Sequence, residues 1–243
     1  DLQAEDMTPW LDTALDPAAL RWVQTSGSTG GRLRVAFSGA DLAYLRAGYL
    51  SDLLALGLRP TDRIGYCRVG PFVSHPAERF GIGVGIHIPT TATLDEQVDR
   101  LQQAEPTFLI GFPNVLLSLA EELTRRGLRV PVRRVLLGGE TTTPQARVML
   151  AEVFGGTLGE VYSCVEAFTI ARSCPRGRLH LRSADVLVEV LRDDGTVSAT
   201  GEGEILVTRL HGTAMPLLRY QLGDRVRIGD IGCDCSTYRT PVV

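Results

Sequence analysis

Short apolar runs alternate with amphipathic stretches from Asp41 to Phe154, and this alternation limits the folds open to the chain. The spacing of the apolar residues predicts helices over 41–58, 94–104, 115–126 and 144–154. Between them, strands are predicted at 63–69, 86–89, 107–111 and 134–138. Strands that alternate with helices favour a three-layer α/β core with a largely parallel sheet, in which ligands bind at the carboxyl ends of the strands.

The pattern changes near residue 179. Apolar runs at Val186–Leu191 and Gly203–Thr208 flank a turn at Asp193-Asp194-Gly195, which is typical of an antiparallel unit. We therefore expect an α/β core over residues 1–178 and a smaller β-rich subdomain over residues 179–243.

Composition excludes several classes of partner. The 243 residues carry a net charge of −3, which gives no electrostatic reason to expect nucleic acid or a membrane surface. No apolar run approaches the roughly 20 residues of a membrane helix, and the N-terminal stretch is acidic rather than signal-like. The sequence predicts a cytoplasmic protein without a membrane partner.

The run Thr25-Ser26-Gly27-Ser28-Thr29-Gly30 has the composition of a phosphate-binding loop. Glycine lets backbone N–H groups approach an anion, and the hydroxyls add donors. The chain has no lysine, so all 25 of its basic residues are arginine and a loop with a phosphate-binding lysine is excluded. Taken alone, the run fits a solvated turn equally well.

Three later segments accompany this loop in a fixed order. They are Leu137-Gly138-Gly139-Glu140, Tyr162-Ser163-Cys164-Val165-Glu166 and Pro216-Leu217-Leu218-Arg219-Tyr220-Gln221-Leu222-Gly223-Asp224. Together the four segments resemble those of the adenylate-forming superfamily of acyl-CoA ligases, aryl-CoA ligases and adenylation domains. In detail they are similar to its phenylacetate-CoA ligase-like branch, over roughly residues 20 to 240.

The resemblance implies ATP, AMP and Mg²⁺ as cofactors and assigns residues to them. Glu166 is expected to bind Mg²⁺, and Asp224 to hold the ribose hydroxyls. The remaining assignments are phosphate contacts from Thr25, Ser26, Gly27, Ser28, Thr29 and Gly30, and adenine contacts from Gly139, Glu140 and Tyr162. Catalytic roles fall to Glu166, Thr25 and Thr29. Taken alone, Tyr162 fits a half-buried strand aromatic better, and Asp224 a turn carboxylate.

The resemblance also places an acyl pocket around Phe72, His75, Phe112 and Gly138. Its aromatic lining suits a flat aromatic acid, but such residues suit an ordinary core as well. The implied function is ATP-dependent activation of a small aromatic carboxylic acid as its acyl-adenylate, for transfer to CoA, an amine or a carrier protein. The alternative is a non-catalytic or partner-dependent protein that binds AMP or another ligand on a truncated ligase fold.

The chain departs from the family at three points. Val165 stands where a hydroxyl residue is usual, and Arg32 and Arg34 are the cations nearest the loop in place of a lysine. The family's C-terminal lid domain, with its lysine, is expected to be absent after residue 243. Turnover without that domain, and assembly as a homodimer, are both left open.

Cys174, His180, Cys233 and Cys235 supply three thiols and one imidazole, the donor set of a closed tetrahedral zinc site. Their spacing is not the common Cys-x-x-Cys pattern, so buried cysteines without metal remain an alternative. The resembling branch has a similar Cys/His pattern, which implies structural Zn²⁺. Cys164 has no histidine nearby in sequence and is expected to line the pocket rather than act as a nucleophile.

Overall fold

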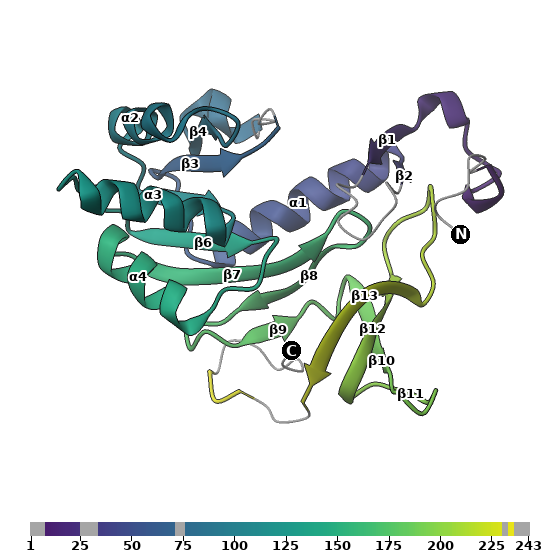
Figure 1. The fold of residues 1–243 in the computed structure, drawn as a ribbon. Helices are drawn as coiled ribbons and strands as arrows, with labels where there is room; N and C mark the ends of the chain where they lie inside the picture. Colours follow the sequence, from purple (N-terminus) through teal and green to yellow (C-terminus); the bar gives the residue numbers. More distant parts are fainter. Residues whose placement is uncertain (1–7, 25–33, 71–75, 230–232, 236–243) are drawn as a thin grey trace. The chain divides into compact units, whose positions relative to one another are not determined.

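The computed structural model describes residues 8–24, 34–70, 76–229 and 233–235 (Figure 1). By compactness the chain forms two units. Unit 1 comprises Asp1–Leu50, Ser163–Arg172 and Arg178–Val243, and unit 2 comprises Ser51–Tyr162 and Ser173–Gly177. The division into residues 1–178 and 179–243 stays a prediction.

A seven-stranded sheet forms the centre of the α/β part. Its strands, in spatial order, are β4 (Val84–Pro89), β3 (Arg63–Arg68), β5 (Phe108–Gly111), β6 (Arg134–Gly138), β7 (Thr157–Cys164), β8 (Phe168–Ser173) and β9 (Leu179–Leu181). The pairs from β4 to β7 are parallel, with Ile110 opposite Leu136. The prediction of a largely parallel sheet is confirmed.

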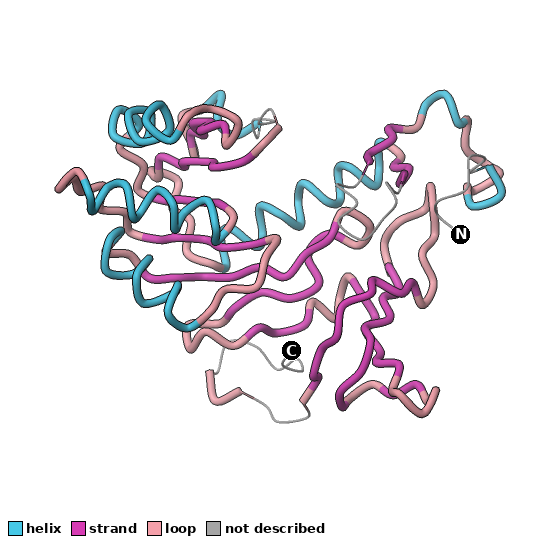
Figure 2. The backbone as a smooth tube through the Cα atoms, viewed as in Figure 1, coloured by secondary structure: helices cyan, strands magenta, loops and turns pink. Residues whose placement is uncertain are grey.

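Helices cover this sheet in unit 2. The helices α2 (Leu94–Ala104), α3 (Pro113–Arg125) and α4 (Pro144–Phe154) lie side by side (Figure 2). Their apolar faces pack on alternate strand residues to form one core, which includes Val98, Leu101, Leu109, Leu116, Leu119, Leu123, Val135, Leu137, Leu150 and Phe154. On the opposite face Leu56, which follows α1 (Gly39–Ala55), lies beside Gly159 with Leu136. The three-layer arrangement is confirmed.

Local signals explain where two of these helices begin. Thr93 forms a capping box with Glu96 at the start of α2. Thr143 accepts a hydrogen bond from the N–H of Ala146, and Pro144 occupies the first turn of α4. Caps of this kind occupy N–H groups that have no partner inside the helix, so the predicted starts at 94 and 144 agree with the structure.

The β-rich part is a four-stranded antiparallel sheet in unit 1. Its spatial order is β11 (Val197–Ser198), β10 (Val186–Leu191), β12 (Gly201–Arg209) and β13 (Tyr220–Ile228). Along β10, Val186, Val188 and Val190 are buried and alternate with less buried residues, as expected of a sheet with one core face. The antiparallel unit predicted after residue 179 is confirmed.

Unit 1 also contains a two-stranded antiparallel ribbon of β1 (Arg21–Gln24) and β2 (Arg34–Phe37). Phe37 of this ribbon is fully buried in a core with Leu20, Val35, Met215 and Leu217. Short 3-10 helices lie at Thr8–Trp10 and Pro17–Ala19 in unit 1, and at Pro76–Phe80 in unit 2. Among the residues that the structure describes, every helix is too short or too polar to cross a bilayer.

Candidate active site

Part of the predicted site falls outside the described residues. This holds for Thr25, Ser26, Gly27, Ser28, Thr29 and Gly30 of the loop, and for Phe72 and His75 of the expected acyl pocket. The described strands on either side of the loop pair directly, with Gln24 opposite Arg34. The phosphate contacts predicted for the loop stay a prediction.

In unit 2 four predicted residues gather where β5 and β6 end. Gly139 has a φ of +80°, and a Cβ built on it would lie 2.5 Å from Cε1 of Phe112, so the Phe112 ring packs directly on this glycine. Glu140 accepts a hydrogen bond from the backbone N–H of Asn114 at 3.2 Å. Gly138 pairs with Val161 across β6 and β7, and Tyr162 is the next residue along β7. Parallel strands place these carboxyl-end residues at one edge of the sheet, where chemistry is expected.

The carboxylate of Glu140 has a structural role at this edge. Phe112 occupies the N-cap position of α3 but has no side chain that can cap, and Glu140 supplies the acceptor from another segment. An anion at a helix N-terminus also interacts favourably with the helix dipole. Glu140 therefore fixes the start of α3 against the Gly138–Glu140 segment.

In unit 1 two of the predicted segments contact each other through Glu166. This residue sits in the turn between β7 and β8, and only 7% of it is exposed. The hydroxyl of Tyr220, at the start of β13, donates a hydrogen bond to Oε1 of Glu166 at 3.4 Å. Because 54 residues separate the two, the fold rather than local sequence creates this contact.

Burial controls the protonation of the groups around Glu166. Burial, and then the charge of Glu166, raises the pKa of Cys164 to about 12. The same two causes raise the pKa of Tyr220 above its usual value. Both groups keep their protons at neutral pH, so Tyr220 remains a donor to Glu166. A thiol with so high a pKa is a poor nucleophile, which agrees with the pocket-lining interpretation of Cys164.

Asp224 lies in β13, at an irregularity of the strand. The register of β12 and β13 shifts between Glu204 and Leu206, whose partners are Arg225 and Gln221. The residues Leu222, Gly223 and Asp224 therefore form a bulge, and Gly223 has a φ of +83°. Bulges redirect side chains at functional sites. Asp224 is exposed at this bulge, and its ribose-binding role stays a prediction.

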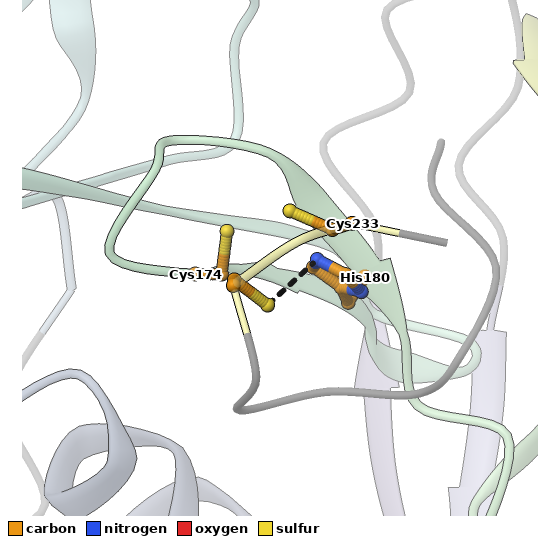
Figure 3. A group of neighbouring side chains, drawn as sticks. Cys174, His180 and Cys233 are labelled. Carbon is orange, nitrogen blue, oxygen red and sulfur yellow. Dashed lines mark hydrogen bonds between the residues drawn. The ribbon is translucent and has the colours of Figure 1, made fainter. Parts of the chain in front are cut away.

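Cys174, His180 and Cys233 lie close together (Figure 3), and Cys235 belongs to the same group. The zinc ion predicted for them stays a prediction. Their ligand atoms all lie within 4.8 Å of one another. Cys174 follows β8 and His180 lies on the neighbouring strand β9, while Cys233 and Cys235 come from the segment after β13. His180 is 1% exposed, and its Nε2 lies 3.7 Å from Sγ of Cys235. No disulfide joins the described cysteines.

Sequence patterns did not reveal two features of unit 1. Arg209, the last residue of β12, is buried although arginine usually lies at the surface. An open surface cavity of about 720 Å³ is lined by Pro9, Trp10, Leu11, Asp12, Thr13, Gly212, Thr213, Pro216 and Leu218. None of the predicted site residues lines it, so we place the candidate site at Glu166 and not at this cavity.

Comparisons with known proteins place these features in context. No family model matches the chain. The chain is 27% identical over 235 residues to the phenylacetate-coenzyme A ligase of Thermus thermophilus, and the match covers 87% of this chain and 51% of that protein. It is 28% identical over 229 residues to the Escherichia coli enzyme of the same name, covering 84% and 50%. The chain spans about half the length of the curated relatives it matches.

Among solved structures, the chain is similar to an open conformation of 2-hydroxyisobutyryl-CoA ligase, with a TM-score of 0.80 and 16% identity. The match covers 94% of this chain and 53% of the other, and at this identity it shows the fold alone. The fold is that of the N-terminal domain of adenylate-forming ligases. Sequence and fold thus confirm the resemblance carried by the motifs: the chain is similar in sequence to phenylacetate-coenzyme A ligases and in fold to a CoA ligase.

Proposed function

We propose that the chain carries the ATP-binding site of an adenylate-forming ligase, which activates a small aromatic carboxylic acid as its acyl-adenylate and passes the acyl group to CoA. The hydrogen bond from Tyr220 to Glu166 carries this proposal, because it joins the two segments expected to hold magnesium and ribose. The curated relatives are named as phenylacetate-CoA ligases, and the structural neighbour binds an acyl-AMP and CoA.

Each predicted site residue that the structure describes would have a role in this reaction. ATP and a carboxylate repel each other, so the site must offset charge and align the acid with the α-phosphorus. The buried Glu166 offers the hard oxygen ligand that Mg²⁺ prefers, and magnesium, when bound, would neutralise phosphate charge. Asp224 would accept hydrogen bonds from the ribose, while Tyr162, Gly139 and Glu140 would border the adenine.

The acid is proposed to be aromatic because of Phe112. Its ring packs on Gly139 and would form one flat wall of the acyl pocket. Phe72, His75 and Gly138 would complete the acyl pocket. CoA is the acceptor that the relatives' names favour, and an amine or a carrier protein is the alternative.

We also propose that Cys174, His180, Cys233 and Cys235 hold a structural zinc ion. The donor set fits, since three sulfurs and one imidazole nitrogen within 4.8 Å can close to tetrahedral Zn–S and Zn–N distances of about 2.0–2.3 Å with small side-chain shifts. Four protein ligands leave no open position for water, so the metal would stabilise the fold and take no part in the reaction.

Acid-dependent exchange of pyrophosphate into ATP tests the main proposal. The purified chain is assayed with Mg²⁺ against a panel of aryl and arylacetic acids. Exchange that depends on one of these acids supports an adenylating enzyme if Glu166→Gln abolishes it and Cys67→Ala leaves it intact. Cys67 is the control because it is a buried thiol of β3 outside the predicted site residues. AMP binding without exchange would instead support the alternative, a ligand-binding protein on a ligase fold.

A further inference from the structure

The guanidinium of Arg209 is buried in unit 1, and only 7% of the residue is exposed. Its Nη1 donates a hydrogen bond to the carbonyl of Glu166 at 3.2 Å, and its Nη2 donates one to the carbonyl of Met215 at 2.8 Å. Its Cζ also lies 5.3 Å from the centre of the Phe37 ring. A buried charge is costly unless polar groups compensate it. The two carbonyls and the ring provide this compensation and hold the guanidinium in one place.

A buried carboxylate, that of Asp41, holds the same loop at two neighbouring residues. Asp41 accepts hydrogen bonds from the N–H groups of Thr213 at 2.9 Å and Ala214 at 3.2 Å. Burial lowers the pKa of Arg209, and the charge of Asp41 opposes that change. The loop before Pro216 is therefore fixed at 213–214 by an anion and at 215 by a cation.

The turn that bears Glu166 does not hold its shape by local preference alone. Phe168, directly after the turn, has a φ of +60°, which a bulky residue rarely adopts. Its ring meets that of Phe37 edge to face at 5.2 Å, and Phe37 in turn lies under Arg209. Tertiary contacts through Phe37 and Arg209 thus maintain the strained backbone beside Glu166.

We propose that Arg209 is a positioning residue for Glu166: its guanidinium fixes the main chain of the Glu166 turn relative to the loop that leads into Tyr220. Two of its N–H groups, in a rigid fork, reach one carbonyl in each segment, which lysine could not do in the same way. This inference rests on the proposed role of Glu166 as the magnesium ligand. It adds that Arg209, which lies outside the four motifs, sets the position of Glu166.

Gly212 provides an independent way to disturb the same contact. A Cβ built on Gly212 would lie 2.0 Å from Nε and 2.4 Å from Cζ of Arg209. Nε of Arg209 has no hydrogen-bond partner among the described residues. A methyl group at position 212 would therefore break no hydrogen bond of Nε directly. The φ of Gly212 lies outside the left-handed range, so alanine there is permitted by the backbone and acts by displacing the guanidinium.

The test compares Arg209→Met, Gly212→Ala and the double variant with wild type in acid-dependent exchange. Arg227→Met is the matched control, because Arg227 is exposed and pairs only with Glu202 among the described residues. We expect kcat to fall about 10²-fold, the order that misplacing a catalytic group costs. The Mg²⁺ concentration for half-maximal activity should rise in both single variants, and the double variant should be no worse than Arg209→Met.

Two further measurements separate positioning from stability. Hydrogen exchange of the amides in 164–170 should accelerate in both single variants, at temperatures where circular dichroism shows that they remain folded, and should not change in Arg227→Met. Added guanidinium ion, below denaturing concentrations, should partly restore Arg209→Ala but not Glu166→Gln.

Unchanged Mg²⁺ dependence and unchanged amide protection in Arg209→Met and Gly212→Ala would overturn the inference. Activity loss that only follows the unfolded fraction would also overturn it. Wild type without any acid-dependent exchange would refute the proposed function instead. In that case the hydrogen-exchange comparison still decides whether Arg209 holds the turn.

Discussion

Replacing Gly139 with alanine should destabilise the protein more than its backbone conformation alone can explain. The φ of +80° costs an L-residue about 1–2 kcal/mol. The new Cβ would also lie 2.5 Å from Cε1 and 2.8 Å from Cδ1 of Phe112, so the ring must move. Overpacking of this kind costs typically about 1–3 kcal/mol, which brings the expected total to about 2–5 kcal/mol.

Gly155→Ala is the matched control. Gly155 has a similar φ of +70° as the C-cap of α4, and a Cβ there would meet nothing within 4 Å. It should therefore cost only the backbone share, about 1–2 kcal/mol. The difference between the two variants, measured from urea unfolding midpoints at equal slopes, isolates the collision with Phe112.

A double-mutant cycle measures the coupling between positions 139 and 112 directly. With Phe112→Ala in the background, Gly139→Ala should lose its excess cost, and the coupling energy should match the difference from Gly155→Ala. Equal destabilisation by Gly139→Ala and Gly155→Ala, or a coupling energy near zero, would refute the packing of Phe112 on Gly139 and with it this part of the proposed acyl pocket.

Three other outcomes are expected. Burial tends to raise the pKa of Asp41, but hydrogen bonds from Thr213, Ser38 and Ala214 outweigh it, and the net pKa is below the ordinary 3.8. The stability that Asp41 contributes is therefore present above this value and is lost as the pH falls through the folded-state pKa, so Asp41→Asn should flatten the acid limb of an unfolding curve; an unchanged limb would contradict this. Elemental analysis should find one zinc per chain, and a chelator should lower the melting temperature; a metal-free protein of equal stability would exclude the zinc site. Asp224→Ala should weaken AMP binding by about 1–3 kcal/mol if its carboxylate accepts from the ribose, and calorimetry that shows equal affinity would remove it from the site.

Much of the α/β part could be predicted because its signals are local. Helix α4 has its cap at Thr143, its proline at the first position and its apolar spacing within one short segment, and its predicted limits agree with the structure. Strand β6 was predicted at 134–138 for the same reason, since five consecutive residues carry its pattern. Such elements depend little on the rest of the chain.

Strand β13 was missed because its pattern is broken. The bulge at Leu222, Gly223 and Asp224 interrupts the alternation, and exposed arginines follow it. A bulge depends on the partner strand, here the register shift at Glu204 on β12, which the sequence of β13 does not contain.

The supporting contacts of the candidate site were not predictable for a related reason. Arg209 reads as an ordinary surface residue at the end of a strand. Its burial depends on Phe37 and on the carbonyl of Glu166, which lie far from it in sequence. Glu140 likewise caps a helix that begins 27 residues before it. The motifs predict which residues belong to the site, and the fold determines which other residues contact them.

Direct detection of the acyl-adenylate tests the central claim. The chain is incubated with ATP, Mg²⁺ and phenylacetic or benzoic acid, and the products are examined by mass spectrometry, with Glu166→Gln as the control. The account predicts an aryl-acyl-AMP that forms with wild type and not with Glu166→Gln. AMP or ATP bound without any acyl-adenylate for any acid, or an adenylate formed equally by Glu166→Gln, would contradict it.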